Sequence, residues 1–486
     1  PSRTTVEKKM RGQKLFVRDI FLHHNGEYAI IESFSDIFSG FPLPEKIPKR
    51  KDGSIMYHTA FYPADLLLPD PQHITAAEMQ KWACVACDQY TSQPEYWQAV
   101  ERLVGQAPST LRLTLPEIYL GEPDVQQRID AIAAHMKDYL SRNLFLCYPH
   151  CFLYLERTLS SGSVRRGLIG MVDLEDYDYL PSSHSLIRAT EGTVLERIPP
   201  RVKIRQDACL ELPHVMMLID DAQRTVIEPL AQAASQELLT KVYDFPLMMD
   251  SGAVKGYLVD SDRQQQITQA LQHLAAPEHF AARYALPPDT PPLLFAVGDG
   301  NHSLATAKAC YERLKQTLPR EQWENHPARY ALVEVVNLHD DSLQFEPVHR
   351  FVTGVEVEGL LQALRAQCEA SELPKPGAQQ ITAVVAGKSI PLYLCRTSGN
   401  LPVGTLQNFL DHYQKEHGGE IDYIHGDDVA VKLSMQPHSI SFLLPAMEKD
   451  QLFPTVLLDG VLPRKTFSMG HACDKRFYLE ARKITR

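Results

Sequence analysis

The sequence predicts a mixed α/β protein (α+β in part) built around one ligand-binding turn. Residues 293–297 form an apolar run, a glycine turn follows at 298–300, and an Ala-rich segment continues to residue 308. This order is typical of a strand, a tight turn and a helix. Segments with helical periodicity, such as 122–143 and 261–276, alternate with apolar runs of strand length. With 486 residues, the chain is long enough for two or three domains.

Composition narrows the class of protein. The chain is 44% apolar and 22% charged, which is ordinary for a soluble globular protein, and its formal charge of -11 argues against a nucleic-acid binder. No run approaches the roughly 18–20 apolar residues of a membrane span, so we expect a cytoplasmic protein with no membrane partner. Nine scattered cysteines indicate reduced thiols, and the lone Cys84–Cys87 pair favours buried small residues over a zinc site. A homo-oligomer is compatible with this composition.

Three regions are expected. Residues 1–55 form a basic N-terminal extension, with Met56 as an alternative natural start. Residues 56–354 form the main α/β domain with the turn, and residues 355–486 form a C-terminal α+β region. The last part of that region, at 464–470, is basic and rich in hydroxyl groups and glycine, so it could close over a phosphate at the site.

The turn itself supplies the first candidate site residues. Gly298 and Gly300 flank Asp299 and let the backbone approach a ligand closely. Asn301 or Ser303 is expected to cap the helix that follows. The N–H groups at a helix start attract anions, above all phosphate.

A basic segment supplies the second set. Arg201, Lys203 and Arg205 alternate with apolar residues, which predicts an extended strand with three cations on one face. Such cations need an anion among them, although a solvated edge strand is the alternative interpretation. Arg188, Glu191 and Arg197 crowd the same short loop.

Polar residues at the ends of apolar runs complete the set. The run 82–88 is expected to be a strand ending at Asp88, and the next residues, with Gln89 and Ser92, form either the lip of a pocket or a capped turn before the helix 96–104. Asp220 and Asp221 follow a buried strand and could hold Mg²⁺ or, more simply, cap the next turn.

Accessory candidates come from later in the chain. They are His349, Arg350 and Lys465.

Four segments together resemble the bacterial and archaeal family catalogued as domain of unknown function 1015. They are 82–97 (WACVACDQYTSQPEYW), 190–205 (TEGTVLERIPPRVKIR), 298–303 (GDGNHS) and 464–470 (RKTFSMG). The resemblance covers residues 57–484 and leaves the basic N-terminal residues outside.

More distantly, the strand–DGxH–helix pattern is similar to the ParB and sulfiredoxin superfamily, which includes free-serine kinases with a DGHHR-like turn. The resemblance implies a ParB/sulfiredoxin-like core in which residues 299–303, including His302, bind nucleotide phosphates. Ser303 stands where the kinases have arginine, so Arg201, Lys203 and Arg205 would have to supply the missing charge.

The function expected on these grounds is a small-molecule phosphotransferase, a kinase of free serine or a similar hydroxy amino acid. It would use ATP, ADP or pyrophosphate with Mg²⁺. The start of the helix after the turn, together with His302, would hold the phosphate. Asp88, Glu191 or Asp299 would accept the proton of the substrate hydroxyl. Glu191 is preferred because nearby arginines would keep it charged and in place.

Two other functions remain open. A cation-rich pocket also fits hydrolysis of phosphoserine or another phosphomonoester. A nucleotide-binding regulatory protein without turnover is the third possibility, since ParB-like folds also serve as switches.

Overall fold

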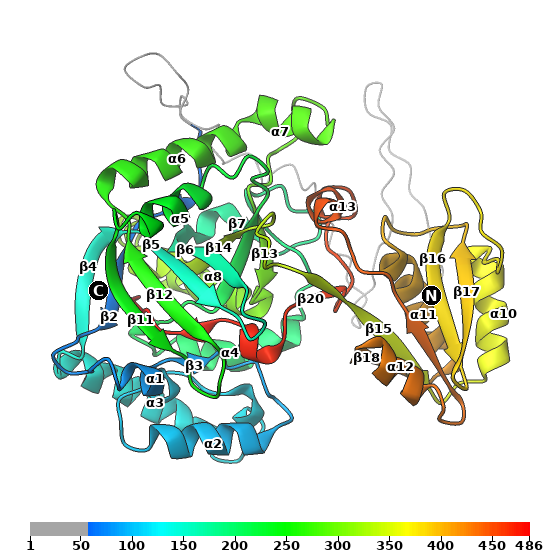
Figure 1. Cartoon of the computed structure of the whole chain (residues 1–486), viewed down its shortest axis with the longest axis horizontal. Helices are drawn as coiled ribbons and strands as arrows, with labels where there is room; N and C mark the ends of the chain where they lie inside the picture. The colour runs from blue at the N-terminus through cyan, green and yellow to red at the C-terminus, as the bar shows by residue number, and fades with distance from the viewer. Residues whose placement is uncertain (1–56) are drawn as a thin grey trace, which may run out of the picture. The chain divides into compact units, whose positions relative to one another are not determined.

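The computed structural model describes residues 57–486, so the predicted basic extension and Met56 lie outside the described residues. The described part is mixed α/β, as predicted, and contains one large mixed sheet, one smaller antiparallel sheet and helices that cover both (Figure 1). Among residues 57–486, no helix is long and apolar enough to cross a membrane.

The large sheet has ten strands and both parallel and antiparallel pairs. In spatial order its strands are β11 (Thr240–Pro246), β12 (Ala253–Leu258), β5 (Leu153–Thr158), β6 (Val164–Asp173), β14 (Tyr330–Asn337), β10 (Val215–Ile219), β13 (Phe295–Asp299), β8 (Ile187–Ala189) and β7 (Tyr177–Asp178), with β1 (Phe61–Tyr62) paired to β6. The central strand β10 is parallel to β14 and antiparallel to β13.

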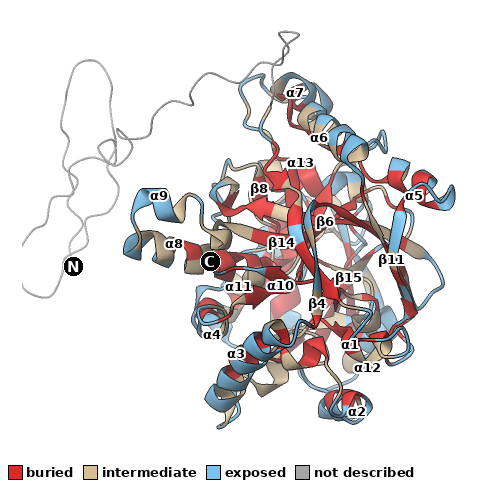
Figure 2. Cartoon of the chain, turned by 90° about the vertical axis from the view of Figure 1, so that its left-hand side faces the viewer, coloured by how far each residue is buried: buried red, intermediate tan, exposed pale blue. Residues whose placement is uncertain are grey.

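Nine helices of the described residues precede the smaller sheet in the chain. They are α1 (Met79–Trp82), α2 (Pro94–Val104), α3 (Val125–Ser141), α4 (Ile198–Arg205), α5 (Glu228–Ser235), α6 (Ser261–Ala275), α7 (Pro277–Tyr284), α8 (Asn301–Thr317) and α9 (Arg320–Trp323). Apolar side chains of α5, α6 and α8 pack on one face of the large sheet. Figure 2 shows buried residues gathered on central strands such as β6 and β14, and exposed residues on outer helices such as α3 and α9.

Alternation along β10 places its side chains in two different cores. Val215, Met217 and Ile219 enter the core with α5, α6 and α8, whereas Met216 and Leu218 enter the core shared with the smaller sheet. This is the period-two pattern of a strand that is buried on both faces. β10, which pairs with the strand before the predicted turn, is therefore held firmly on both sides.

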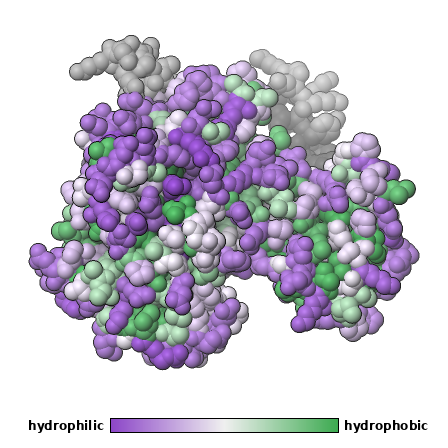
Figure 3. All heavy atoms as spheres, in the orientation of Figure 1, coloured by the Kyte–Doolittle hydropathy of each residue, from purple (hydrophilic) through white to green (hydrophobic). Residues whose placement is uncertain are grey.

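The smaller sheet and its helices form what we call the small lobe. Its strands, in spatial order, are β17 (Lys388–Leu394), β16 (Gln379–Val385), β19 (Ser439–Leu443), β15 (Phe345–Thr353) and β18 (Glu420–His425), and the short β20 (Phe467–Met469) pairs with the start of β15. Its helices are α10 (Val357–Cys368), α11 (Pro402–His417), α12 (Asp427–Leu433) and α13 (Leu452–Asp459). Figure 3 shows a mostly hydrophilic surface on the visible face, with some apolar side chains on the small lobe.

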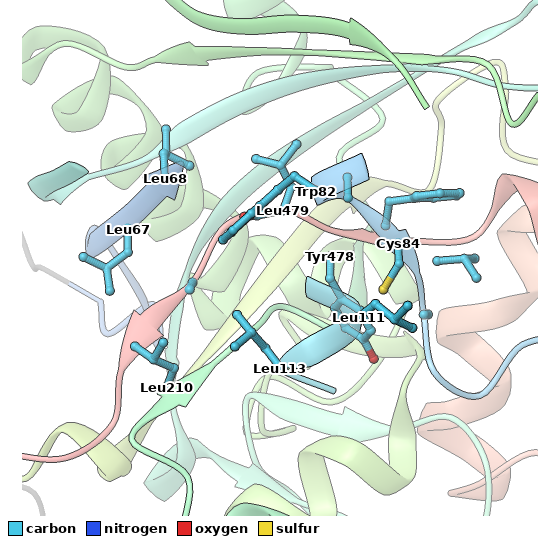
Figure 4. Close-up of a cluster of buried hydrophobic side chains, with 14 of the residues drawn as sticks. Leu67, Leu68, Trp82, Cys84, Leu111, Leu113, Leu210, Tyr478 and Leu479 are labelled. Carbon is cyan, nitrogen blue, oxygen red and sulfur yellow. The ribbon is translucent and has the colours of Figure 1, made fainter. Parts of the chain in front are cut away.

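The C-terminal segment packs against the part of the chain near residues 64–85. Three two-stranded sheets join early and late segments or brace them: β2 (Ala64–Pro69) with β4 (Phe145–Cys151), β21 (Phe477–Tyr478) with β3 (Cys84–Val85), and β22 (Arg482–Lys483) with β9 (Leu210–Glu211). Figure 4 shows Trp82, Cys84, Tyr478 and Leu479 in one buried cluster. The indole N–H of Trp82 donates to the Leu479 carbonyl over 3.0 Å. This packing brings distant residues of the sequence to one place.

Several local predictions are confirmed, and others are wrong. The helical segments predicted at 122–143 and 261–276 are confirmed as α3 and α6. The expected strand 82–88 is wrong, because helix α1 reaches Trp82 and only Cys84–Val85 is extended.

Candidate functional site

The predicted turn joins β13 to α8 through Gly300. Gly300 has φ +80°, a left-handed conformation that L side chains rarely adopt. A Cβ atom at this position would lie 2.9 Å from Cδ2 of His214 and 3.0 Å from Cα of Val215. At Gly298, a Cβ atom would lie 2.9 Å from Cε of Met469. Gly300 is therefore required by its conformation and by close packing, whereas a side chain at Gly298 would have to displace the flexible end of Met469.

Helix α8 begins without a side-chain cap, so the expected capping by Asn301 or Ser303 is wrong. Because Gly300 makes the turn, Asn301 is already helical, and its Nδ2 donates back to the Val297 carbonyl over 3.3 Å. The backbone N–H groups of Asn301, His302 and Ser303 have no acceptor within residues 57–486. The buried Oδ1 of Asn301 likewise has no partner there. An uncapped helix start of this kind attracts an anion.

Asp299 forms an ion pair that the sequence did not reveal. Its Oδ2 lies 3.2 Å from Nζ of Lys475, a residue of the C-terminal segment. Arg157 and Arg165 fix that segment by donating to the carbonyls of Cys473 and Asp474, each over 2.8 Å. Lys475 thus places a positive charge beside the turn. Ser303, which stands in the position of an arginine in the free-serine kinases, cannot supply this charge. No local pattern marks Lys475, because its role depends on the return of the chain end.

Glu191 lies on the loop beside this turn. Its Oε1 accepts a hydrogen bond of 3.2 Å from the backbone N–H of Lys465, and Glu191 pairs with Leu462 as an isolated β-bridge. Burial and the nearby Asp299 carboxylate raise the pKa of Glu191, although Lys465 and Lys475 oppose this shift. A carboxylate with a raised pKa is better suited to accept a proton near neutral pH.

The cations around Glu191 are not the expected arginines of its own loop. The guanidinium group of Arg188 is buried and donates to the carbonyls of Ser185 and Pro291 over 2.9 and 3.0 Å. Arg188 therefore braces the backbone. Lys465 and Lys475 are the cations that act on the pKa of Glu191.

The predicted basic strand is a helix, α4 (Ile198–Arg205), and the prediction of three cations on one face is wrong. Two prolines in its first turn favour this helix start, which the alternation of charges concealed. Arg201 pairs with Glu117, and Arg205 pairs with Glu211. Lys203 points to solvent on another side of the helix, and Arg197 is exposed at its start.

His302 is held in its neutral form. Its Nε2 accepts a hydrogen bond of 3.2 Å from the backbone N–H of Val194. Burial, together with the charges of Arg201 and Arg197, lowers the pKa of His302 to about 4. These two arginines therefore act on the first turn of α8, while Lys203 and Arg205 do not contribute to this shift.

Asp88 is engaged with a residue that the sequence did not single out, His214. Its Oδ2 lies 3.3 Å from Nε2 of His214, and Gln89 donates to its Oδ1 over 2.8 Å. Burial alone would raise the pKa of Asp88, but His214, Gln89 and Lys475 lower it overall. Asp88 is thus a poor proton acceptor. Ser92 lies exposed before α2, whose N-cap is Gln93, so the capping expected from Ser92 is wrong.

The accessory candidates lie in two different places, one beside Glu191 and one within the small lobe. Arg350 donates to the carbonyls of Arg464 and Lys465 over 3.1 Å each, so it supports the loop next to Glu191. His349 instead pairs with Asp427 at 2.8 Å, within the small lobe. Lys465 itself has φ +55°, an unusual value for a residue with a side chain. Such a conformation persists where surrounding contacts impose it.

The strand end considered for Mg²⁺ is occupied by hydrogen-bond donors. Asp220 binds Arg283, Tyr284 and His339, and Asp221 accepts from the backbone of the following turn. This end of β10 has the capping role. Within residues 57–486, no group of three or more His, Cys, Asp or Glu side chains is arranged to hold a metal ion.

Comparisons with known proteins place this geometry in context. Three solved structures resemble the chain at 10% sequence identity. A conserved hypothetical protein from Pyrococcus furiosus has a TM-score of 0.33 and covers 65% of this chain and 94% of its own. Truncated SbnI from Staphylococcus aureus has a TM-score of 0.33, with 62% and 82% covered. A free serine kinase in complex with AMP has a TM-score of 0.35, with 65% and 90% covered.

No curated protein matches the chain. The family model described as "Protein of unknown function (DUF1015)" matches residues 70–413, which is more than half of the sequence. The matched residues include three of the four sequence motifs, 464–470 lying beyond them, and the chain belongs to the DUF1015 family.

Proposed function

We propose that the protein is a phosphotransferase that phosphorylates the hydroxyl group of a small molecule, free serine or a similar hydroxy amino acid. The observation that carries this proposal is the start of α8, where three N–H groups without an acceptor among residues 57–486 lie beside the Asp299–Lys475 pair and Glu191. Phosphoryl transfer depends mainly on positioning and on neutralising charge, and this set of groups offers both.

Each group has a distinct role in this proposal. The N–H groups of Asn301, His302 and Ser303 bind phosphate oxygens, and Lys475 neutralises charge that develops during transfer. Glu191 accepts the proton of the substrate hydroxyl, because burial and Asp299 raise its pKa. Neutral His302 does not add charge.

Mg²⁺ fits this site as a companion of the phosphates. Mg²⁺ bound with a nucleotide commonly uses one or two protein carboxylates and several phosphate oxygens. Asp299 and Glu191 provide two carboxylates, close enough that the charge of Asp299 raises the pKa of Glu191. Asp299 would hold the ion, which would neutralise the phosphate oxygens, and Glu191 would remain free to accept the proton.

The test is direct product detection. Purified protein is incubated with L-serine, Mg²⁺ and either ATP, ADP or pyrophosphate, and phosphoserine is measured by mass spectrometry. We expect phosphoserine with at least one donor and its loss in Glu191→Gln. If no donor gives more product than Glu191→Gln does, serine is not the acceptor, and the same assay with other hydroxy amino acids decides whether the reaction class holds.

Hydrolysis of a phosphomonoester is the second candidate, favoured by Ser303 in place of the kinase arginine, which leaves less cationic charge for a donor. Release of phosphate from phosphoserine without any donor would support it. Nucleotide binding measured by calorimetry, without product in either assay, would instead indicate a regulatory protein.

A further inference from the structure

A cavity of about 160 Å³ lies beside the first turns of α8 and the last turn of α4. Its lining is mostly apolar and includes Leu113, Met136 and Leu332. An apolar cavity of about 150 Å³ is large enough to bind benzene. This cavity is therefore large enough for a short hydrocarbon chain or a single ring.

Three reactive side chains, Cys87, His214 and Tyr478, also line this cavity. Nδ1 of His214 lies 2.5 Å from Oη of Tyr478, and that hydroxyl lies 3.2 Å from Sγ of Cys87. On its other side, Nε2 of His214 faces Asp88 at 3.3 Å. The four side chains form a continuous polar chain from a carboxylate to a thiol.

The carboxylate of Asp88 favours a positive charge on His214, which belongs to the same chain of side chains as the thiol. Burial alone would lower the pKa of His214, but Asp88 and a side-chain hydrogen bond with Cys87 raise it well above its usual value. A thiol beside a cationic imidazole is the arrangement of activated cysteines. A carboxylate that orients the imidazole is the third member of nucleophilic triads.

We propose that Cys87 is a nucleophilic thiol that accepts the acyl group of an apolar ester or thioester bound in this cavity. Sγ of Cys87 attacks the carbonyl carbon, forming an S–C bond while the bond to the leaving oxygen or sulfur breaks. The thiol proton, which the hydroxyl of Tyr478 relays to His214 to form the cationic imidazole, returns by the same route to the leaving group. Ser303 and Leu304 of the first turn of α8 line the same cavity as Cys87.

This site uses other side chains than the proposed phosphoryl transfer. That reaction relies on Glu191, Asp299 and Lys475, whereas the thiol site relies on Cys87 and His214. The second cysteine of the motif, Cys84, is fully buried, hydrogen-bonded to Thr110, and burial raises its pKa to about 12. Cys84 is therefore a matched control within the same short segment.

The experiment uses p-nitrophenyl hexanoate as an apolar acyl probe with the full chain. Release of p-nitrophenolate is followed in time, and the acylated residue is found by peptide mass mapping. We expect one hexanoyl group on Cys87, an unchanged rate in Cys84→Ser, no adduct in Cys87→Ser, and a rate at least about 100-fold lower in His214→Gln. Acylation of the exposed Cys147 at an equal rate, or an undiminished rate in His214→Gln, would overturn the proposal.

A second measurement uses the protein without substitutions, so the test stays decisive even if a variant fails to fold. It compares the rates at which two acyl probes react with each cysteine. The hexanoyl probe should react faster than p-nitrophenyl acetate at Cys87, because the cavity binds the longer chain. At Cys147 the two probes should not show this preference. Equal rates of the two probes at Cys87 would show that the cavity does not select the acyl group.

Discussion

Two neighbouring strands of the large sheet, β10 and β13, end in acidic residues, yet the two strand ends differ in what surrounds them. After β10, Asp220 contacts Arg283, Tyr284 and His339. Asp221 accepts from the backbone N–H groups of Thr225 and Val226 over 2.6 and 2.9 Å. Every carboxylate there already has its partners. This end stabilises a turn.

The end of β13 has the opposite character. Asp299 pairs with Lys475 and caps no helix, and three N–H groups of α8 have no acceptor within residues 57–486. Free donors beside a partly exposed cation are an incomplete arrangement, and an anionic ligand would complete it. Acidic residues after a strand are thus a weak indication of function, and the unsatisfied donors distinguish the two ends.

The largest expected effect concerns the two carboxylates with raised pKa, one near each strand end. Glu191→Gln should lower kcat for phosphoryl transfer by about 100- to 10,000-fold, the usual contribution of a general base. Glu228→Gln is the matched control, since burial raises the pKa of Glu228 as well but its Oε1 binds Asn337 beside β10. Steady-state kinetics with equal losses in both variants would show that the effect is structural.

The next effect concerns the cation at each end. Lys475→Met should weaken pyrophosphate binding about 10- to 100-fold, because a charge-assisted hydrogen bond contributes about 1.5–3 kcal/mol. Arg283→Met, which removes one of the three partners of Asp220, should leave this affinity unchanged. Isothermal titration calorimetry measures both. Unchanged pyrophosphate binding in Lys475→Met would show that the phosphate does not bind at this end of β13.

For the free energy of unfolding, we expect the larger effect at the end of β10 and the smaller effect at the end of β13. Asp221→Ala leaves two backbone N–H groups of the following turn without their acceptor, so the free energy of unfolding should fall by about 2 kcal/mol. Asp299→Ala removes one partly exposed ion pair and should cost under about 1 kcal/mol. Urea unfolding followed by circular dichroism checks both. A larger loss of stability in Asp299→Ala than in Asp221→Ala would show that the end of β13, and not the end of β10, has the structural role.

The sequence predicted the local part of this site because local patterns encode it. The apolar run, the glycines and the Ala-rich segment sufficed to predict β13, the turn and α8. The basic segment 201–205 misled, because alternating charges outweighed Pro199 and Pro200, which belong to the first turn of a helix.

The remaining site residues depend on contacts that no local pattern encodes. Lys475 reaches Asp299 because the chain end returns to the large sheet, and Tyr478 reaches His214 through the pairing of β21 with β3. His214 itself is a single histidine before a buried strand. Its position under Gly300 follows only from the antiparallel register of β10 and β13.

The smallest expected effect is a pH dependence at the start of α8. The pKa of His302 is about 4 in the folded protein, below the usual 6.5, because burial and the charges of Arg201 and Arg197 oppose protonation. The unfolded chain therefore binds the proton first as the pH falls. The stability that neutral His302 contributes is complete above pH 6.5 and is lost between about 6.5 and 4.

Because His302 is partly exposed, this contribution should stay under about 1 kcal/mol after solvent screening. Urea unfolding at pH 7.5 and pH 5 should show a steeper loss of stability in the natural protein than in His302→Gln. Glutamine keeps an acceptor for the Val194 N–H but cannot take up a proton. An equal loss in both proteins would mean that His302 is protonated as readily in the fold as in water. In that case the start of α8 would already be negative enough to offset its arginines, which would contradict an open anion site at the end of β13.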